Sequence, residues 1–217
     1  LEGAAVHLRK GGSVPQDYNG TTGGSVWTQS DWTGGPGQVA WGDETKYDTD
    51  NGSVDSNSNP TGLRLRKVSS DYLSPGILES SVYDTGTDLS NYTSINWLPT
   101  SQDKAAEVKF QIASSNSSTG PWNYFGPDGT NSTYYTVSGS AISSAHDNNR
   151  FVRYKVFLST TNNKKTPVIT SLVLNYVSGC YTPGQVAFYD LTSGNNYDLD
   201  VSLAGYQTYI ENNMTIN

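Results

Sequence analysis

The sequence predicts an all-β protein whose main part is an antiparallel β-sandwich. The chain is rich in turn-forming and aromatic residues, with 22 Gly, 15 Tyr and 5 Trp among 217 residues. Short alternations of apolar and polar residues recur along it, bounded by Gly, Pro, Asn and Ser. No stretch shows the apolar spacing that a helix requires. About eight or nine such strands without a helix favour a sandwich or a jelly roll.

The clearest strands are two runs between residues 150 and 176, joined by an Asn- and Lys-rich turn. Within each run every second residue is apolar, which suits a sheet with one buried face. Arg153 and Lys155 fall on the opposite, exposed face of the first run. The buried faces are predicted to hold Val152, Tyr154, Val156, Leu158, Leu172, Leu174 and Tyr176.

Partner strands for this pair are predicted from their alternation along the chain. The best example is 106–113, where Val108, Phe110 and Ile112 alternate with polar residues. Gly-rich or polar segments at 11–24, 34–37 and 48–60 are predicted to be loops and turns. The other predicted strands lie at 1–10, 38–41, 63–68, 76–83, 92–98, 122–125 and 133–137.

The segment after residue 176 differs from the preceding part in its pattern of predicted strands and turns. Strands are predicted at 186–191 and 197–203 and from Met214 onward, with turns at 193–196 and 205–206. About three or four strands are too few to form a stable core alone. This segment therefore needs a further strand from elsewhere.

Residues 184–206, GQVAFYDLTSGNNYDLDVSLAGY, resemble the carboxypeptidase regulatory-like and collagen-adhesin B-type repeats, which are small transthyretin-like sandwiches of extracellular proteins. The first strand of that family, GA-x-V-x-L, matches residues 3–8 instead. The resemblance implies one small transthyretin-like β-sandwich made of 1–12 and 180–217. A jelly-roll-like β-sandwich over 20–177 would be inserted into it. Some such repeats form a Lys–Asn isopeptide bond beside a Glu, but Asp200 or Val201 stands at that position here, so no such bond is predicted.

The inserted part is similar to a β-sandwich module of large secreted bacterial proteins. The similarity covers 31–48, 77–86, 122–130 and 150–176. Many of those proteins are surface adhesins or carry type IV pilin-like leaders. The similarity therefore implies an extracellular or cell-surface location.

Charge and cysteine content limit the partners. The formal net charge of −7 disfavours nucleic acid and anionic membranes, because both need basic patches. The basic cluster at 63–67 alternates with leucines and is expected to be the exposed face of a strand. No stretch is long and apolar enough to span a membrane. Cys180 is the single cysteine, so no disulfide can form within the chain.

A sugar-binding platform is one candidate site, because flat rings stack on the apolar faces of pyranoses. Each ring has the alternative of packing in the core. The candidates are Trp27, Trp32, Trp41, Trp122, Tyr134 and Tyr135.

The loop at 48–57 is a candidate calcium site. Asp48, Asp50 and Asp55, with Asn51 and Asn57, supply oxygens of the kind that Ca²⁺ prefers. The spacing misses the EF-hand rule, and no Glu closes the loop. The alternative is a solvated, turn-forming loop, and no other cofactor is predicted.

No catalytic set is recognisable. His7 and His146 are the two histidines, and neither stands in a Ser/His/Asp or Cys/His pattern. The chain is therefore predicted not to be an enzyme. Six Asn-x-Ser/Thr sites would carry glycans if the organism glycosylates exported proteins: Asn19, Asn51, Asn91, Asn116, Asn131 and Asn213.

Together these features predict a structural or adhesive subunit of an extracellular assembly, such as a pilus-like filament or a surface array. Its terminal strands, 4–8 or 214–216, would pair with copies of itself or with adjacent repeats. The alternatives are a carbohydrate-binding module for surface glycans and a spacer, either within a larger secreted protein.

Overall fold

The computed structural model describes residues 5–10, 16–19, 24–57, 62–177, 193–202 and 205–216. Its elements are strands, apart from one short 3-10 turn at Ser144–His146, which confirms the all-β prediction. The chain divides into a small unit, Leu1–Gly24 with Cys180–Asn217, and a large unit, Ser25–Gly179. Within the described ranges, no helix is long and apolar enough to cross a membrane.

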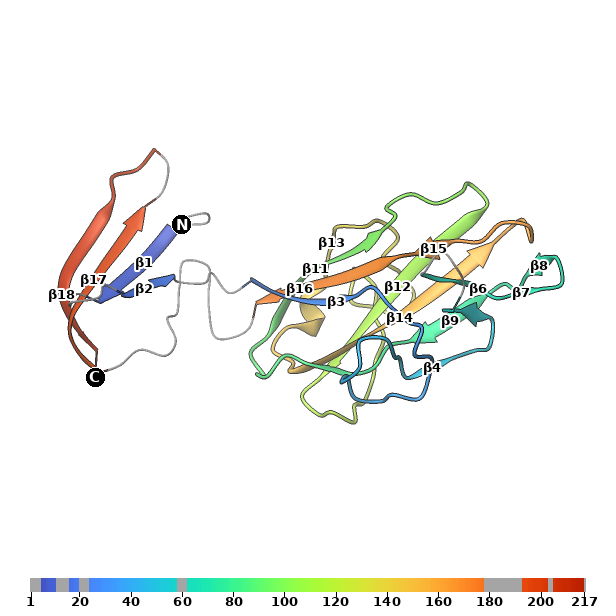
Figure 1. The fold of residues 1–217 in the computed structure, drawn as a ribbon, viewed down its shortest axis with the longest axis horizontal. Helices are drawn as coiled ribbons and strands as arrows, with labels where there is room; N and C mark the ends of the chain where they lie inside the picture. The colour runs from blue at the N-terminus through green and yellow to red at the C-terminus, as the bar shows by residue number, and fades with distance from the viewer. Residues whose placement is uncertain are drawn as a thin grey trace. The chain divides into compact units, whose positions relative to one another are not determined.

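The large unit contains two main sheets, named here after their central strands (Figure 1). In the β14 sheet, the long central strand pairs with one strand on one side and with two short, successive strands on the other. Its strands are β14 (Phe151–Thr160), β12 (Ala106–Ser115), β9 (Gly76–Glu79), β10 (Tyr83–Asp84) and β4 (Thr49–Asp50).

The β11 sheet forms the second layer. Its strands are β13 (Ser140–Ala141), β11 (Asn91–Leu98), β16 (Ser171–Val177) and β3 (Gly24–Gln29), in that order. Short pieces complete the unit: β15 (Val168–Ile169), β6 (Leu63–Leu65) and β5 (Val54–Asp55) as one sheet, and the hairpin β7 (Lys67–Val68) with β8 (Asp71–Tyr72).

The core lies between the two layers and confirms the predicted inner faces. The predicted inward residues of β12, β14 and β16 are buried, as the alternation required. Arg153, predicted on the exposed face of β14, is 4% exposed, because the segment 122–134 covers that face. The rings of Trp97 on β11 and Phe110 on β12 lie 4.9 Å apart and join the layers. Each such buried apolar side chain contributes roughly 1.5–3 kcal/mol.

A buried polar chain ties the long segment after β3 to this core. The Trp32 indole N–H donates to the Tyr154 hydroxyl at 2.8 Å, and that hydroxyl donates to Gln29 Oε1 at 2.6 Å. The Gln29 amide in turn donates to the carbonyls of Asp31, Glu44 and Lys46. These side chains add to main-chain hydrogen bonds of the segment, such as those from Trp41 N–H to the Val82 carbonyl and from Asp48 N–H to the Glu79 carbonyl.

Three predicted short strands are only isolated bridges, a correction to the sequence reading. Ala40 bridges Val82 in place of a strand at 38–41, and Phe125 and Tyr135 bridge β12 in place of strands at 122–125 and 133–137. Flanking Gly, Pro and Asp turns leave these segments too short for a ladder. The expected loop at 48–60 in turn contains β4 and β5.

The described part of the small unit is one antiparallel sheet in the order β18-β17-β1-β2 (Figure 1). The strands are β1 (Ala5–Lys10), β2 (Gln16–Asn19), β17 (Gly194–Ser202) and β18 (Tyr209–Ile216). β1 pairs with β17 from Ala5 opposite Ser202 to Lys10 opposite Tyr197. The start and the end of the chain therefore share one sheet.

The small sheet also corrects several details. The expected loop at 11–24 contains β2, which pairs with β1, so the sheet reaches beyond the predicted boundary at residue 12. β18 starts at Tyr209, five residues before the predicted Met214. The predicted strand at 186–191 lies outside the described residues.

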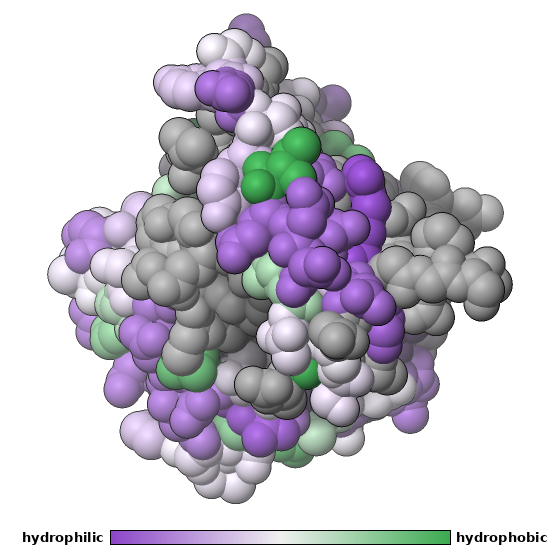
Figure 2. All heavy atoms as spheres, turned by 90° about the vertical axis from the view of Figure 1, so that its left-hand side faces the viewer, coloured by the Kyte–Doolittle hydropathy of each residue, from purple (hydrophilic) through white to green (hydrophobic). Residues whose placement is uncertain are grey.

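The exposed surface agrees with the polar composition. Figure 2 shows a face where hydrophilic residues predominate and hydrophobic ones form separate spots.

Candidate functional site

Three outward-facing residues of β14 each contact one aromatic ring from the segment 122–134. The Arg153 guanidinium lies 5.6 Å from the Trp122 ring, and Lys155 Nζ lies 4.0 Å from the Tyr124 ring. The Phe157 ring meets the Tyr134 ring edge-on, with centroids 5.2 Å apart. These six residues are called the ring face: Trp122, Tyr124, Tyr134, Arg153, Lys155 and Phe157.

The segment is held against β12 by its backbone and by Gln111. Main-chain hydrogen bonds join Phe125 to Ile112 and Tyr135 to Phe110. The Gln111 amide donates to the carbonyls of Asn131 and Thr133, at 3.0 and 2.9 Å. Between them the loop doubles back at Gly126, where a Cβ would lie 2.3 Å from the Thr133 backbone, so only glycine fits.

Ion pairs hold the charged side of the ring face. Arg153 Nη2 lies 2.7 Å from Asp48 Oδ2, and Lys155 Nζ lies 2.6 Å from Glu79 Oε1. The Tyr124 hydroxyl donates to the other oxygen of Glu79 at 3.0 Å. The Arg153 side chain is 5% exposed and that of Glu79 28%. Two carboxylates therefore balance two cations, one of which is nearly buried.

The pKa shifts fix the protonation states at neutral pH. Burial alone would raise the pKa of Glu79, but the contacts from Lys155, Tyr124 and Arg153 outweigh it and hold that pKa below its usual value. Burial raises the pKa of the Tyr124 hydroxyl. Glu79 is therefore a carboxylate and Tyr124 a neutral donor.

Lys109 on β12 extends the face. Its Nζ lies 5.5 Å from the Tyr134 ring and 2.9 Å from Glu107 Oε2. Here too a cation lies on a ring and is balanced by a carboxylate.

The sugar-platform prediction is wrong for Trp27, Trp32 and Tyr135. Their side chains are 2%, 1% and 0% exposed and belong to the core between the sheets. Trp41 is partly buried and packs edge-on against Trp27 at 5.2 Å. A chain with few large aliphatic residues fills its core with aromatic rings.

Trp122 and Tyr134 are the two predicted aromatic residues that reach the ring face. Sequence reasoning missed Tyr124, Phe157 and the two cations as parts of one site. The sequence did contain a pattern that indicates this site. Tyr124 lies two residues after Trp122, and residues 153, 155 and 157 lie on one face of a strand. The sequence did not reveal that the two segments overlie each other.

The predicted calcium ligands do not converge. Asp48 contacts Arg153, Asp50 accepts from the Tyr47 hydroxyl, and Asp55 accepts from the Asn57 amide N–H. Asn51 accepts from the N–H groups of Ser53 and Ile77. No group of three or more His, Cys, Asp or Glu gathers in the described part of the chain. Calcium binding therefore stays a prediction, and the predicted ligands each contact a different partner.

The structure forms one Ser–His contact that the sequence did not suggest. Ser114 Oγ lies 3.0 Å from His146 Nδ1, but the histidine is 2% exposed and its Nε2 has no hydrogen-bond partner. Burial lowers the pKa of His146 to about 4. Because the imidazole is buried and no carboxylate orients it, this contact does not resemble a catalytic pair.

The predicted glycosylation sites differ in their surroundings. Asn51, Asn116, Asn131 and Asn213 are all exposed, and the side-chain amides of Asn51 and Asn116 also donate to the carbonyls of Pro75 and Asn148. Asn91 is partly buried, and the side chain of Asn19 lies outside the described residues. Modification of any of these asparagines stays a prediction.

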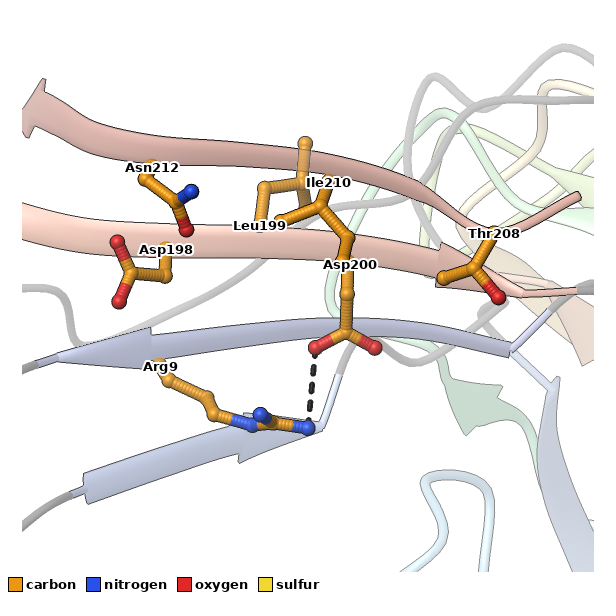
Figure 3. Close-up of a pocket in the computed structure, with 7 residues that line it drawn as sticks. All are labelled: Arg9, Asp198, Leu199, Asp200, Thr208, Ile210 and Asn212. Atoms are coloured by element: carbon orange, nitrogen blue, oxygen red, sulfur yellow. Dashed lines mark ion pairs between the residues drawn. The ribbon is translucent and has the colours of Figure 1, made fainter.

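The small unit carries a shallow depression of about 360 Å³ (Figure 3). The Arg9 side chain reaches Asp200 with 3.1 Å between the charged atoms. Asp198 accepts from the Asn213 N–H at 3.0 Å. Ile210 on β18 also lines it. Both carboxylates are therefore engaged within the sheet.

The edge strand β18 borders this depression. It pairs with β17 on one side and is the last strand of the sheet among the described residues. Residues 205–213 are exposed throughout. β1, by contrast, is an interior strand between β17 and β2, so the prediction that 4–8 pairs with another copy is wrong.

No protein-family model, no curated protein and no solved structure matches the chain. The resemblances drawn from the sequence therefore stay predictions, and the functional argument rests on the residues themselves.

Proposed function

We propose that the chain is a non-catalytic structural or adhesive module of an extracellular assembly, and that neighbouring copies join by strand addition at β18. The observation that carries the proposal is the position of β18 at the edge of the small sheet, with exposed side chains along most of its length.

An edge strand offers a row of main-chain N–H and C=O groups to another strand. On β18 this row is accompanied by two large exposed apolar side chains, Tyr209 at 55% and Ile210 at 61%. Glu211 is the single charged residue on the strand. Natural edges that avoid association carry more charge or a proline.

The geometry limits the pairing segment to the first half of β18. Asn213 has a φ of +63°, and the register with β17 shifts around Tyr197 and Leu199. Such irregularities block regular pairing beyond them. Residues 209–212 remain as the regular segment.

A second copy is the partner that fits best. Two β18 strands pair antiparallel about a two-fold axis, because an isologous contact uses the same surface on both molecules. Centring the pair on Ile210 sets each Glu211 opposite a Tyr209, so the carboxylates do not face each other.

The few buried apolar side chains in the described part of the small unit also favour a partner strand. Leu8 and Tyr197 are the buried hydrophobic side chains among the described residues of this unit. Sheets with little buried apolar surface are marginal alone. Strand addition enlarges the sheet and adds main-chain hydrogen bonds.

Sedimentation velocity of the full chain over a range of concentrations tests the proposal. Wild-type protein is expected to form dimers, and Ile210→Lys to shift them to monomer, because lysine on an edge opposes pairing. Val137→Lys is the matched control, since Val137 is 66% exposed in the large unit. A monomeric wild type at all concentrations contradicts strand addition.

The spacer alternative predicts a monomer without a ligand in the same experiment. Carbohydrate binding is the other alternative, and the partly exposed rings of Trp122 and Tyr134 favour it.

A further inference from the structure

We propose that the ring face is a binding site for a neutral oligosaccharide that lies along β14. This assignment is independent of strand addition at β18, because its residues belong to the large unit alone.

Aromatic stacking supplies the first part of the argument. Tyr124, Tyr134 and Phe157 are partly exposed, although they lie on the outer side of a sheet whose inner side is fully packed. Exposed rings on a rigid surface bind the apolar C–H face of a pyranose through dispersion and burial of apolar area. Tyr134 and Phe157 meet edge-to-face, and both side chains keep part of their surface exposed.

The spacing of the contacts points to more than one sugar. Residues 153, 155 and 157 of β14 project from the same face, about 7 Å apart in succession. Each has its own ring from the segment 122–134. A ligand with repeating units matches such a row better than a single small molecule.

The balance of charge excludes ionic ligands. Asp48 and Glu79 neutralise Arg153 and Lys155, and Glu107 neutralises Lys109. An acidic or basic ligand would have to break one of these pairs and leave its partner without a counter-charge, which is costly where the groups are partly buried. A neutral polyol breaks none of them.

Hydrogen-bonding capacity remains beside the rings. The Lys155 ammonium has three N–H donors, and Glu79 is its ion-pair partner. The carboxylate of Glu79 has lone pairs beyond those used by Lys155 and Tyr124. Sugar hydroxyls donate and accept at once, so they suit a site that offers both.

The site is also rigid before any ligand arrives. Asp128 Oδ1 accepts from the N–H and hydroxyl of Thr130 and from the hydroxyl of Thr133, which closes the loop between Tyr124 and Tyr134. A site that is already ordered loses little conformational entropy on binding.

Titration calorimetry on the full chain tests the inference, with cellohexaose, xylohexaose, mannohexaose and maltohexaose as neutral probes and an oligogalacturonate as the acidic probe. At least one neutral probe is expected to bind with a Kd below about 1 mM. Tyr134→Ala is expected to weaken that binding about tenfold or more. Tyr134→Leu, which keeps an apolar contact to Phe157, should weaken it as well.

Tyr206→Ala is the matched control, because Tyr206 is 66% exposed in the small unit and should leave affinity unchanged. Ile210→Lys should bind like the wild type, which separates this test from that of strand addition. The inference is overturned if none of the four neutral probes binds, if only the oligogalacturonate binds, or if both folded Tyr134 variants bind like the wild type.

Discussion

The two units differ in how completely they cover their own sheets. In the large unit each main sheet packs against the other, and the outer face of the β14 sheet is partly covered by the segment 122–134. In the small unit the described residues form a single sheet that ends in an exposed strand. We therefore expect the large unit to be stable through its own core, and we propose that the exposed edge of the small unit takes up a partner strand.

The substitution with the largest expected effect tests whether the core of the large unit stabilises that unit. Trp32→Ala removes a side chain that is 1% exposed and should lower the free energy of unfolding by about 3–5 kcal/mol. Denaturation followed by tryptophan fluorescence measures it, because all five tryptophans lie in the large unit. A loss below about 1 kcal/mol would show that this core does not carry the unit's stability.

Tyr154→Phe should have a smaller effect. The change keeps the ring but leaves the Trp32 indole N–H and Gln29 Oε1 buried without their partner, which costs roughly 1–3 kcal/mol. The same fluorescence measurement checks it. Tyr206→Phe in the small unit, where the hydroxyl is exposed, should change nothing.

Acidification should weaken the large unit through His146. Its pKa in the folded chain is about 4, below the ordinary value of 6.5, so the unfolded chain takes up a proton first as the pH falls. The stabilisation is complete above pH 6.5 and decreases toward pH 4, with a loss of about 2 kcal/mol by pH 5. Urea denaturation at pH 7 and pH 5 measures this.

His146→Leu is the matching variant and should lose that part of the pH dependence. An identical change in wild type and variant between pH 7 and pH 5 would contradict the assignment.

The strands whose apolar and polar residues alternate were the predictable part of the fold, because this alternation indicates which side chains are buried. The period of two over 106–113 and 152–158 fixed which face of β12 and β14 lies in the core. It did not show that Gln111 and Arg153 on the opposite face are buried as well. The last forty residues contain too few strands to form a core alone, so pairing with the first strand was predicted. The structure confirms this, because β1 pairs with β17.

The candidate site was predictable only in part. Trp122 and Tyr134 were among the expected sugar contacts, but Trp27 and Trp32 were equally good candidates from sequence and are core residues. Composition does not reveal whether a ring faces inward. The pairing of each ring with an outward residue of β14 depends on how the loop at Gly126 folds back, which is a tertiary feature.

Hydrogen exchange in the segment 209–212 tests the role of β18 most directly. At low protein concentration its outward-facing amides should exchange quickly, and at high concentration they should become protected, while amides of β14 stay protected throughout. Exchange in this segment that is independent of concentration would contradict the account, because the edge would then have no partner strand.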